Sequence, residues 1–324
     1  MKKIKVGIVG YGNVGKGAEK VLHHTDDMEL VGVFTRRAPN TLTLADPKVP
    51  VYSVDDAPSL TDRIDVMLLC GGSATDLQEQ APHFASMFNL VCSYDNHLKI
   101  PEYLASVDAA AKDTSAIISA GWDPGLFSMV KLLSESILPN GKTYTFWGPG
   151  LSQGHSDALR RIVGVKNAVQ YTLPIDKAIE AVRSGALPDF TTREKHLREC
   201  FVVLEPGADP VEVERQIKSM PNYFADYDTA VHFIDENELM QNHAHMPHGG
   251  TVLHSGKTTD HEHVIEFALK LESNPEFTAS IMVACARACH RLFENGTFGA
   301  KTVFDIPLAY LSPKSHAALV KELL

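Results

Sequence analysis

The sequence KVGIVGYGNVGKGAEKVLHHTDDMELVGVFTRR occupies residues 5–37 and is the most informative part of the chain. It opens with a short apolar, β-branched run, residues 5–9, of the kind that parallel sheets bury. A turn with three glycines follows without a gap, and the next residues have the pattern of a helix through Val21 and Leu22. A second apolar run, residues 30–34, completes the spacing of a strand, a helix and a strand, which predicts a nucleotide-binding unit.

The three glycines of this turn each have a physical role in such a unit. Gly10 permits the tight turn, Gly12 lets the backbone approach a pyrophosphate, and Gly15 lets the helix pack closely on the strand. The N–H groups at the start of the helix attract the phosphate charge. Glycine turns also follow buried strands that bind nothing, so the turn alone is weak evidence. The two flanking strands favour cofactor binding.

The end of the second strand indicates which cofactor binds. An NAD enzyme usually places Asp or Glu there to accept the ribose hydroxyls, whereas this chain has Thr35, Arg36 and Arg37. A guanidinium group pairs with a 2′-phosphate that a carboxylate would repel. The alternative is that both arginines are solvated loop charges. Because they follow this strand directly, we predict NADP as the cofactor.

Length and composition restrict the class of protein. A chain of 324 residues with 44% hydrophobic and 22% charged residues is expected to form two globular domains. We expect no signal peptide or membrane span, because the chain enters its first strand at once and has no apolar run of sufficient length. Five cysteines without a Cys-x-x-Cys pair indicate reduced thiols in the cytoplasm, and Cys285 and Cys289 fit a buried helix face better than a metal site. The net charge of −10 argues against nucleic-acid binding.

Three more strands of the first domain end in polar or small residues. Residues 65–70 lead into the small residues 71–75, residues 90–93 lead to Asp95, and residues 116–119 lead to Asp123. Ligands of open α/β sheets bind at the carboxyl ends of the strands. The predicted cofactor site therefore comprises Gly10, Tyr11, Gly12, Asn13, Val14, Thr35, Arg36, Arg37, Cys70, Gly71, Gly72, Ser73, Ala74 and Thr75.

The second half of the chain has a different pattern. Strands are expected at 144–147, 169–173, 200–204, 230–234, 251–255 and 264–271, with helices at 177–183 and 211–220 and a polar loop at 148–157. We predict an α/β protein: residues 1–122 form a Rossmann-type, doubly wound dinucleotide-binding domain that 275–324 completes. Residues 123–274 form an α+β domain for substrate binding and dimerisation, with an open mixed sheet that is largely antiparallel and has its helices on one face. The longest helical pattern, 276–293, should pack back on the first domain.

Seven segments of the chain form a specific set of motifs. They are YDNH at 94–97, GWDPG at 121–125, FWGPGLSQGHSDALRRI at 146–162, QYTLP at 170–174, CFVV at 200–203, MPHGG at 246–250 and the surroundings of 274–275. Together they resemble the meso-diaminopimelate dehydrogenase family. The resemblance spans essentially the whole chain. It implies a homodimer that catalyses the reversible, NADP-dependent oxidative deamination of the D centre of meso-2,6-diaminopimelate. The implied products are ammonium, NADPH and L-2-amino-6-oxopimelate, which cyclises to tetrahydrodipicolinate on a bacterial route to lysine.

The residues are consistent with such a substrate, which carries two ammonium groups and two carboxylates. Asp95 and Asp123 could hold the reacting ammonium and assist its deprotonation, although each could instead cap the helix that follows. Trp122 and Trp147 could line the aliphatic chain of the substrate, although Trp is more often a core residue.

The resemblance assigns the distal, L-configured end of the substrate to Thr172, Arg198, His248 and Asn274, with Gln153 and Gly154 nearer the middle. Without it, Arg198 would be equivalent to Arg160, Arg161 and Arg193. The nearby histidines His243, His245, His261 and His263 raise a metal site as an alternative, but their spacing fits no common zinc pattern, and we predict none. Two other functions remain open: a semialdehyde dehydrogenase with Cys70 as nucleophile, and a non-catalytic NADPH sensor.

Overall fold

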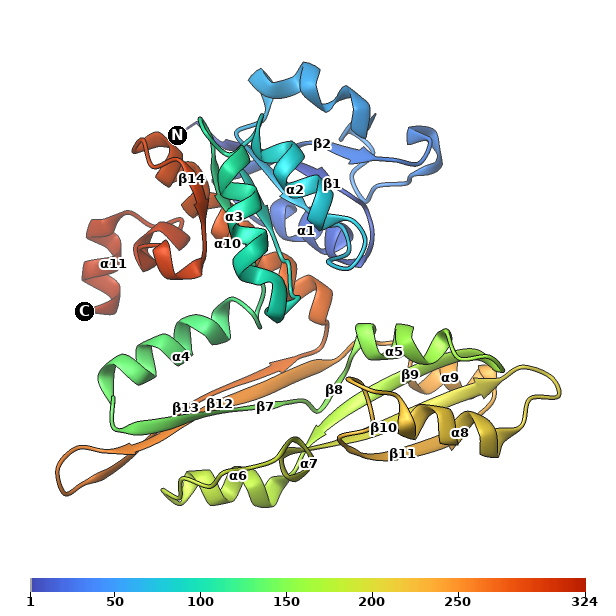
Figure 1. Cartoon of the computed structure of the whole chain (residues 1–324). Coiled ribbons are helices and arrows are strands. Elements are labelled where there is room, and N and C mark those ends of the chain that lie inside the picture. The colour runs from blue at the N-terminus through green and yellow to red at the C-terminus, as the bar shows by residue number, and fades with distance from the viewer. Residues whose placement is uncertain (1) are drawn as a thin grey trace. The chain divides into compact units, whose positions relative to one another are not determined.

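The computed structural model describes residues 2–324, which form two compact units (Figure 1). The first unit comprises the chain up to Met129 together with Pro275–Leu324, and the second comprises Val130–Asn274. Helix α4, Leu126–Ile137, crosses the boundary between them. In residues 2–324, no helix is both long and apolar enough to cross a membrane.

A seven-stranded sheet with only parallel pairs lies at the centre of the first unit. Its order is β14-β6-β5-β4-β1-β2-β3. The strands are β1 Ile4–Val9, β2 Met28–Thr35, β3 Val51–Ser53, β4 Val66–Leu69, β5 Leu90–Cys92, β6 Ser115–Ile117 and β14 Gly299–Lys301. From β3 to β6, the strands lie in the order 3-2-1-4-5-6, which is the order of a doubly wound sheet. The order reverses between β1 and β4, so the switch point lies there. The predicted Rossmann-type fold is confirmed.

Helices cover both faces of this sheet. The α-helices of the unit are α1 Asn13–His23, α2 Leu77–Ala85, α3 Ile100–Ala110, α10 Asn274–Glu294 and α11 His316–Leu323, joined by 3₁₀ turns at Pro39–Thr41, Val54–Arg63, His97–Lys99, Val303–Asp305 and Leu308–Leu311. Because strand side chains alternate, Ile8 and Leu68 pack with α1 and α10, whereas Met67 and Leu69 pack with α2 and α3. The long C-terminal helix thus belongs to the core of the first unit.

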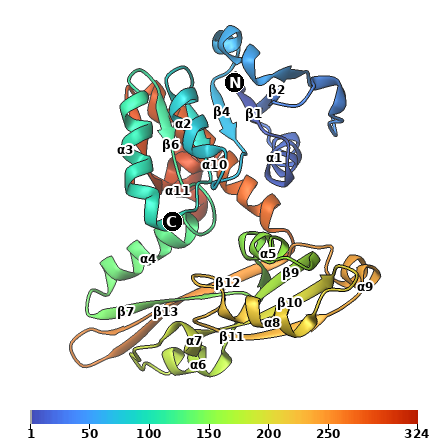
Figure 2. The same cartoon turned by 45° about the vertical axis from the view of Figure 1, so that its right-hand side comes forward.

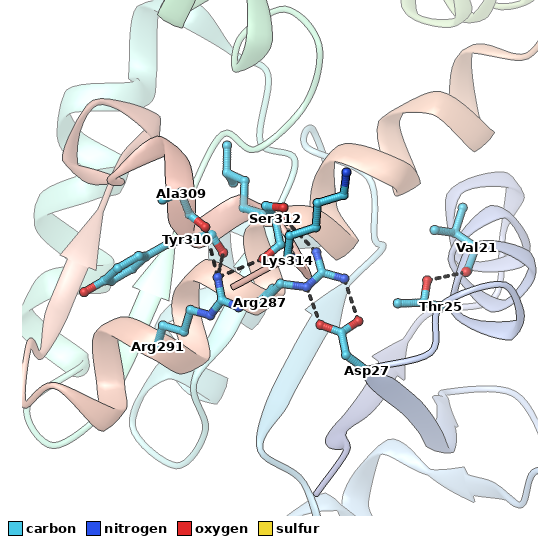
Figure 3. A network of polar contacts seen from close by, with 10 residues as sticks. Val21, Thr25, Asp27, Arg287, Arg291, Ala309, Tyr310, Ser312 and Lys314 are labelled. Carbon is cyan, nitrogen blue, oxygen red and sulfur yellow. Dashed lines mark hydrogen bonds and ion pairs between the residues drawn. The ribbon is translucent and has the colours of Figure 1, made fainter. Parts of the chain in front are cut away.

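Two arginines of α10 bind the chain's last segment and the residues before β2 (Figure 3). Arg287, with a side chain only 6% exposed, donates from Nε and Nη2 to the carboxylate of Asp27 at 2.5 and 2.8 Å, and from Nη1 to the carbonyl of Leu311. Arg291 donates from Nη1 to the carbonyls of Ala309, Tyr310 and Ser312. The segment after β14 is therefore held by charged donors that are themselves partly or fully buried.

The pair of Arg287 and Asp27 makes stability depend on acid pH. The hydrogen bonds from Arg287 hold the pKa of Asp27 below its usual value, although burial opposes this. A lowered folded-state pKa gives stability that is present above the unfolded value of about 3.9 and is lost as pH falls through the folded value. We expect Asp27→Asn to lower the free energy of unfolding by about 1–3 kcal/mol at pH 7.

The difference in free energy of unfolding between Asp27→Asn and wild type, measured by urea titration, should become smaller below about pH 4. Asp26→Asn is the matched control, because Asp26 is exposed and its side chain makes no hydrogen bond or ion pair within residues 2–324. An equal loss for Asp27→Asn at pH 7 and at pH 3 would mean that the ion pair is not the cause.

The second unit contains two sheets where we predicted one. A four-stranded sheet has the order β11-β10-β9-β8, and a three-stranded sheet has the order β13-β12-β7. The strands are β7 Gly141–Trp147, β8 Gly150–Leu151, β9 Val165–Pro174, β10 His196–Leu204, β11 Asp228–Phe233, β12 His248–Lys257 and β13 Glu262–Leu271. All pairs are antiparallel except β10 with β11, so the larger sheet is mixed. Figure 1 shows β12 and β13 beside β7.

The division into two sheets has a local cause between β7 and β8. Gly148 has a φ of +99°, and a Cβ at this position would lie 2.0 Å from the carbonyl oxygen of Thr172. Pro149 has no N–H to donate to a neighbouring strand. The ladder therefore breaks at these two residues, and the chain passes from one sheet to the other.

The helices of the second unit are α5 Gln153–Arg160, α6 Asp176–Arg183, α7 Thr192–Lys195, α8 Pro210–Ser219 and α9 Glu236–Asn242. Helix α5 corrects our prediction of a polar loop at 148–157. Leu159 and Ile162 pack in one core with Val202 of β10 and Val213 of α8, so burial of this side outweighs the polar residues on the other. Figure 2 shows α8 alongside β10 and β11.

Candidate active site

A pocket of about 360 Å³ lies at the carboxyl ends of the central strands of the first unit. Its walls come from the ends of β1 and β2, the residues after β4, and the start of the turn before α1. The lining residues are Val9, Gly10, Tyr11, Gly12, Phe34, Thr35, Arg36, Arg37, Val54, Cys70, Gly71, Gly72, Asp76 and Gln80. This volume lies within the range of about 300–1,000 Å³ that is typical of small-molecule sites.

The three glycines of the turn have the geometry that a dinucleotide requires. Gly10 has a φ of +88°, and a Cβ on Gly15 would lie 2.2 Å from the carbonyl oxygen of Gly10. A Cβ on Gly12, in contrast, would meet nothing within 4 Å. Gly12 is the first residue before α1, whose first turn has no acidic side chain. The backbone is thus open to a phosphate at the position where the helix N-terminus attracts one.

The arginines after β2 lie at the other side of this pocket. Arg36 donates from Nη2 to Asp76 at 2.7 Å, and Asp76 also accepts from the backbone N–H of Gly72 at 3.0 Å. Burial opposes ionisation of Asp76, but these donors outweigh it and lower its pKa. Within residues 2–324, the Arg37 guanidinium has no hydrogen bond or ion pair. Two cations therefore face the pocket, and one carboxylate holds Arg36 in place.

The two predicted carboxylates lie at neighbouring strand ends in the first unit. Asp95 follows β5, is exposed, and donates its backbone N–H to the Ser73 hydroxyl at 3.2 Å, which connects it to the turn after β4. Asn96 is the N-cap of the 3₁₀ turn His97–Lys99, and Lys99 is the N-cap of α3. Neither side chain makes a capping hydrogen bond, and Asp95 occupies neither position, so Asp95 is not a helix cap. Asp123 follows β6 and is half-buried in the turn 121–125.

A buried cationic site lies in the second unit, where β9 pairs with β10. Arg198 and Thr172 are paired residues of this ladder, and they are 6% and 3% exposed. The Nη1 group of Arg198 donates to the Thr172 hydroxyl. Burial lowers the pKa of Arg198, and no carboxylate among the described residues pairs with it. A buried guanidinium without a counter-ion is costly, so this site is suited to an anionic ligand.

Three buried polar atoms around Arg198 support this interpretation. The Nε of Arg198, the Nδ1 of His196 and the Oε1 of Gln170 have no hydrogen-bond partner within residues 2–324. His196 accepts a bond from the Trp147 backbone N–H at Nε2, and burial lowers its pKa to about 3, so Nδ1 carries the proton of the neutral ring. Two unpaired donors and one unpaired acceptor fit the carboxylate and ammonium of an amino acid.

Other predicted residues surround the same place through the segment 246–250. Gln153 contacts Met246 through its amide, and the Asn274 backbone N–H donates to the Met246 carbonyl at 3.0 Å. His248 is buried, and a Cβ on Gly150 would lie 2.4 Å from its ring. Because Gly150 pairs with Thr172 in the sheet, His248 lies beside the Arg198 site.

A model of the diaminopimelic acid dehydrogenase C-terminal domain matches residues 121–273. The meso-diaminopimelate D-dehydrogenase of Ureibacillus thermosphaericus is 63% identical over 327 residues, which cover 100% of both chains. This chain belongs to the diaminopimelate dehydrogenase family.

Two solved structures of related proteins have the same fold. The diaminopimelate dehydrogenase of Corynebacterium glutamicum in complex with diaminopimelate is 46% identical, with a TM-score of 0.94 and 100% of both chains covered. An engineered D-amino acid dehydrogenase bound to NADP⁺ is 45% identical, with a TM-score of 0.89 and 100% of both chains covered. The resemblance seen in the sequence and the predicted fold class are both confirmed.

The pocket contains most of the cofactor residues predicted from the sequence, but not all of them. Asn13, Val14, Ser73, Ala74 and Thr75 are absent from its lining, although they follow lining residues directly. Sequence reasoning missed Val9, Phe34, Val54, Asp76 and Gln80. Phe34 and Val54 carry no signal beyond hydrophobicity. Asp76 gave only a weak one, since it comes four residues after a glycine that could approach a ligand.

The two tryptophans have different surroundings. Trp122, in the first unit, is 7% exposed and packs edge-on against Phe127. Trp147, in the second, is half-buried and stacks on His196 at a centroid distance of 5.2 Å. Trp147 therefore lies beside the Arg198 site, whereas Trp122 is largely a core residue next to Asp123.

Two alternatives raised by the sequence find no support. Cys70 lines the pocket, but burial raises its pKa to about 12, which keeps it a neutral thiol and excludes the role of activated nucleophile. Among residues 2–324, no group of three His, Cys, Asp or Glu side chains could hold a metal. His243 instead hydrogen-bonds Tyr171 at 3.0 Å and stacks on Phe201.

Proposed function

We propose that this chain catalyses the reversible, NADP-dependent oxidative deamination of the D centre of meso-2,6-diaminopimelate. The products are ammonium and L-2-amino-6-oxopimelate, which cyclises to tetrahydrodipicolinate in bacterial lysine biosynthesis. The observation that carries the proposal is the buried Arg198 without a counter-ion, in a family member whose first unit has a dinucleotide pocket. A dicarboxylate with one reacting amine matches both features.

NADP binds in the pocket of the first unit. The open backbone at Gly12 and the N-terminus of α1 take the pyrophosphate, while Arg36, Arg37 and the Thr35 hydroxyl take the 2′-phosphate. Gly71 to Thr75 follow β4 at the edge where the nicotinamide end is expected. Bound NADP⁺ supplies the hydride acceptor.

Residues of the first unit act on the reacting end of the substrate. An ammonium nitrogen has no lone pair, so it must lose a proton before a carbon–nitrogen double bond can form. Asp123 and Asp95 hold this ammonium and accept the proton. Trp122 lies next to Asp123 in sequence and presents an apolar surface to the substrate chain.

Residues of the second unit hold the distal, L-configured end. Arg198 and Thr172 bind the distal carboxylate. His248 and Asn274 lie near them and complete the binding of the carboxylate and ammonium of the L centre. Trp147, Gln153 and Gly154 contact the middle of the substrate. A Cβ on Gly154 would meet nothing within 4 Å, which leaves room for a ligand.

The first unit takes the role of a dinucleotide-binding domain, and the second takes that of a substrate-binding and dimerisation domain. The sequence predicted the boundary between these domains after residue 122, whereas the compact units divide after Met129. The homodimer that the family resemblance implies would form through this second unit. All five cysteines are free and buried, which supports a cytoplasmic protein.

The reverse reaction tests this function directly. The enzyme is mixed with NADPH and tetrahydrodipicolinate, with and without ammonium, and absorbance of the reduced nicotinamide is followed. We expect a loss of absorbance that requires ammonium. Oxidation of NADPH without ammonium, or binding of NADPH without turnover, would contradict the proposal and indicate another oxidoreductase or a sensor.

The cofactor preference gives a separate prediction. Replacing both Arg36 and Arg37 by Ala removes charge-assisted hydrogen bonds worth roughly 1.5–3 kcal/mol each, so affinity for NADPH should fall at least about tenfold. Affinity for NADH should change little. Fluorescence titration with each cofactor measures this, and Arg63→Ala removes a similar exposed charge outside the pocket as a control. Equal losses for NADPH and NADH would show that the arginines do not recognise the phosphate.

A further inference from the structure

The guanidinium of Arg198 is in contact with protein on one edge and on one face. Its Nη1 donates to Thr172, and its Cζ lies 3.9 Å from the ring centroid of Tyr227. At that distance the cation lies over the aromatic ring, in the geometry of a cation–π contact. Tyr227 had no distinguishing feature in the sequence.

These contacts leave one edge of Arg198 for a ligand. The Nε is buried and has no hydrogen-bond partner among the described residues. The Nε and Nη2 groups point in parallel along one edge of the fork, which pairs with both oxygens of a carboxylate. Thr172 and Tyr227 together therefore determine which edge of the cation faces the substrate.

The segment that carries Tyr227 is itself firmly held. Phe224 is fully buried in the core between α5, α8 and β10, and the Tyr227 N–H donates to its carbonyl at 3.0 Å. Arg193 donates to the Ala225 carbonyl and pairs with Asp228. Directly after Tyr227, β11 pairs with β10, and Thr229 lies opposite Arg198. The ring is thus presented by an anchored turn.

His155 of α5 contacts the same turn. Its ring packs edge-on against Tyr223 and Phe224, and Nδ1 lies 2.8 Å from the Ser152 hydroxyl. Burial, followed by the nearby charge of Arg198, lowers the pKa of His155 to about 3. His155 is therefore neutral, and it adds no second positive charge beside Arg198.

We propose that Tyr227 is a positioning residue that sets the specificity of this enzyme for substrates with a distal carboxylate, by holding the Nε–Nη2 edge of Arg198 toward the substrate. The ring covers one face of the cation, excludes water from it, and limits rotation of the side chain. This inference rests on the proposed function. It adds a residue of the turn 221–227 to the recognition of the substrate's distal end.

The test compares two substrates that differ only in the distal carboxylate. meso-Diaminopimelate has this group, and D-lysine is the same molecule without it. We expect Tyr227→Leu to raise the KM for meso-diaminopimelate about tenfold, the size of a desolvated cation–π contact, with little change in kcat. The ratio of kcat/KM for meso-diaminopimelate to that for D-lysine should fall by a similar factor.

Tyr227→Phe is the matched control, because it keeps the ring, and it should keep both values within about threefold of wild type. Tyr227→Gln, similar in length but without the ring, replaces the Leu variant if that one does not fold. An unchanged substrate ratio in the Leu or Gln variant would overturn the inference, as would an equal loss in the Phe variant. Failure of the wild-type enzyme to oxidise meso-diaminopimelate would instead refute the proposed function.

Discussion

Replacing Asp123 by Asn should leave NADPH binding intact and lower the rate of deamination of meso-diaminopimelate by about 100-fold or more, the usual loss for a general base. Asn is close in shape but cannot accept the proton of the reacting ammonium. Asp95→Asn should act in the same direction. Because the proposed role of both carboxylates is in the chemical step, the loss should persist at saturating substrate.

Steady-state kinetics and NADPH titration of both variants measure this effect. The titration is the control, because an unchanged affinity shows that the first unit remains folded. A variant whose change is confined to KM would have lost a substrate-binding group, and its carboxylate would have no role in proton transfer. The roles of Asp95 and Asp123 can be distinguished in this way, because each residue is replaced alone.

Replacing Arg198 by Ala should weaken binding of meso-diaminopimelate by roughly 30-fold to several thousand-fold, which corresponds to about 2–5 kcal/mol for an unpaired, desolvated charge. Arg198 is buried, and its Nε has no partner within residues 2–324, so the substitution removes a donor that is left for the ligand, together with the contacts to Thr172 and Tyr227. The KM for NADP should not change, because the cofactor pocket belongs to the first unit.

Arg198→Lys is the informative control for this site. Lysine keeps the charge but lacks the planar fork, so it should recover only part of the affinity. Full recovery by Lys would mean that charge alone is recognised. A KM for meso-diaminopimelate that is unchanged in Arg198→Ala would remove Arg198 from the substrate site.

The first unit was largely predictable from local patterns. Glycine spacing reports backbone geometry directly, and the structure has Gly10 at a positive φ, Gly12 open to solvent and Gly15 packed on the strand. Buried parallel strands are continuous apolar runs, which made β1, β2 and β4 visible. The strands β3 and β14 are only three residues long and carry no such pattern.

The second unit was less predictable because its arrangement depends on contacts between distant residues. The break into two sheets follows from the carbonyl of Thr172 lying against Gly148, which no local pattern reveals. Helix α5 is stabilised by burial against β9 and α8, which its own sequence does not reveal. Its polar residues therefore predicted a loop. Arg198 was selected by resemblance, and its isolation in the core became evident only from the structure.

In the proposed reaction, one end of the substrate is held at Arg198 while only a D centre reacts at the other. Turnover of the meso, L,L and D,D isomers of diaminopimelate by the wild-type enzyme tests it most directly. We predict that the meso isomer reacts at its D centre alone and that the L,L isomer is a poor substrate even if it binds. Comparable rates on the L,L and meso isomers would contradict the account.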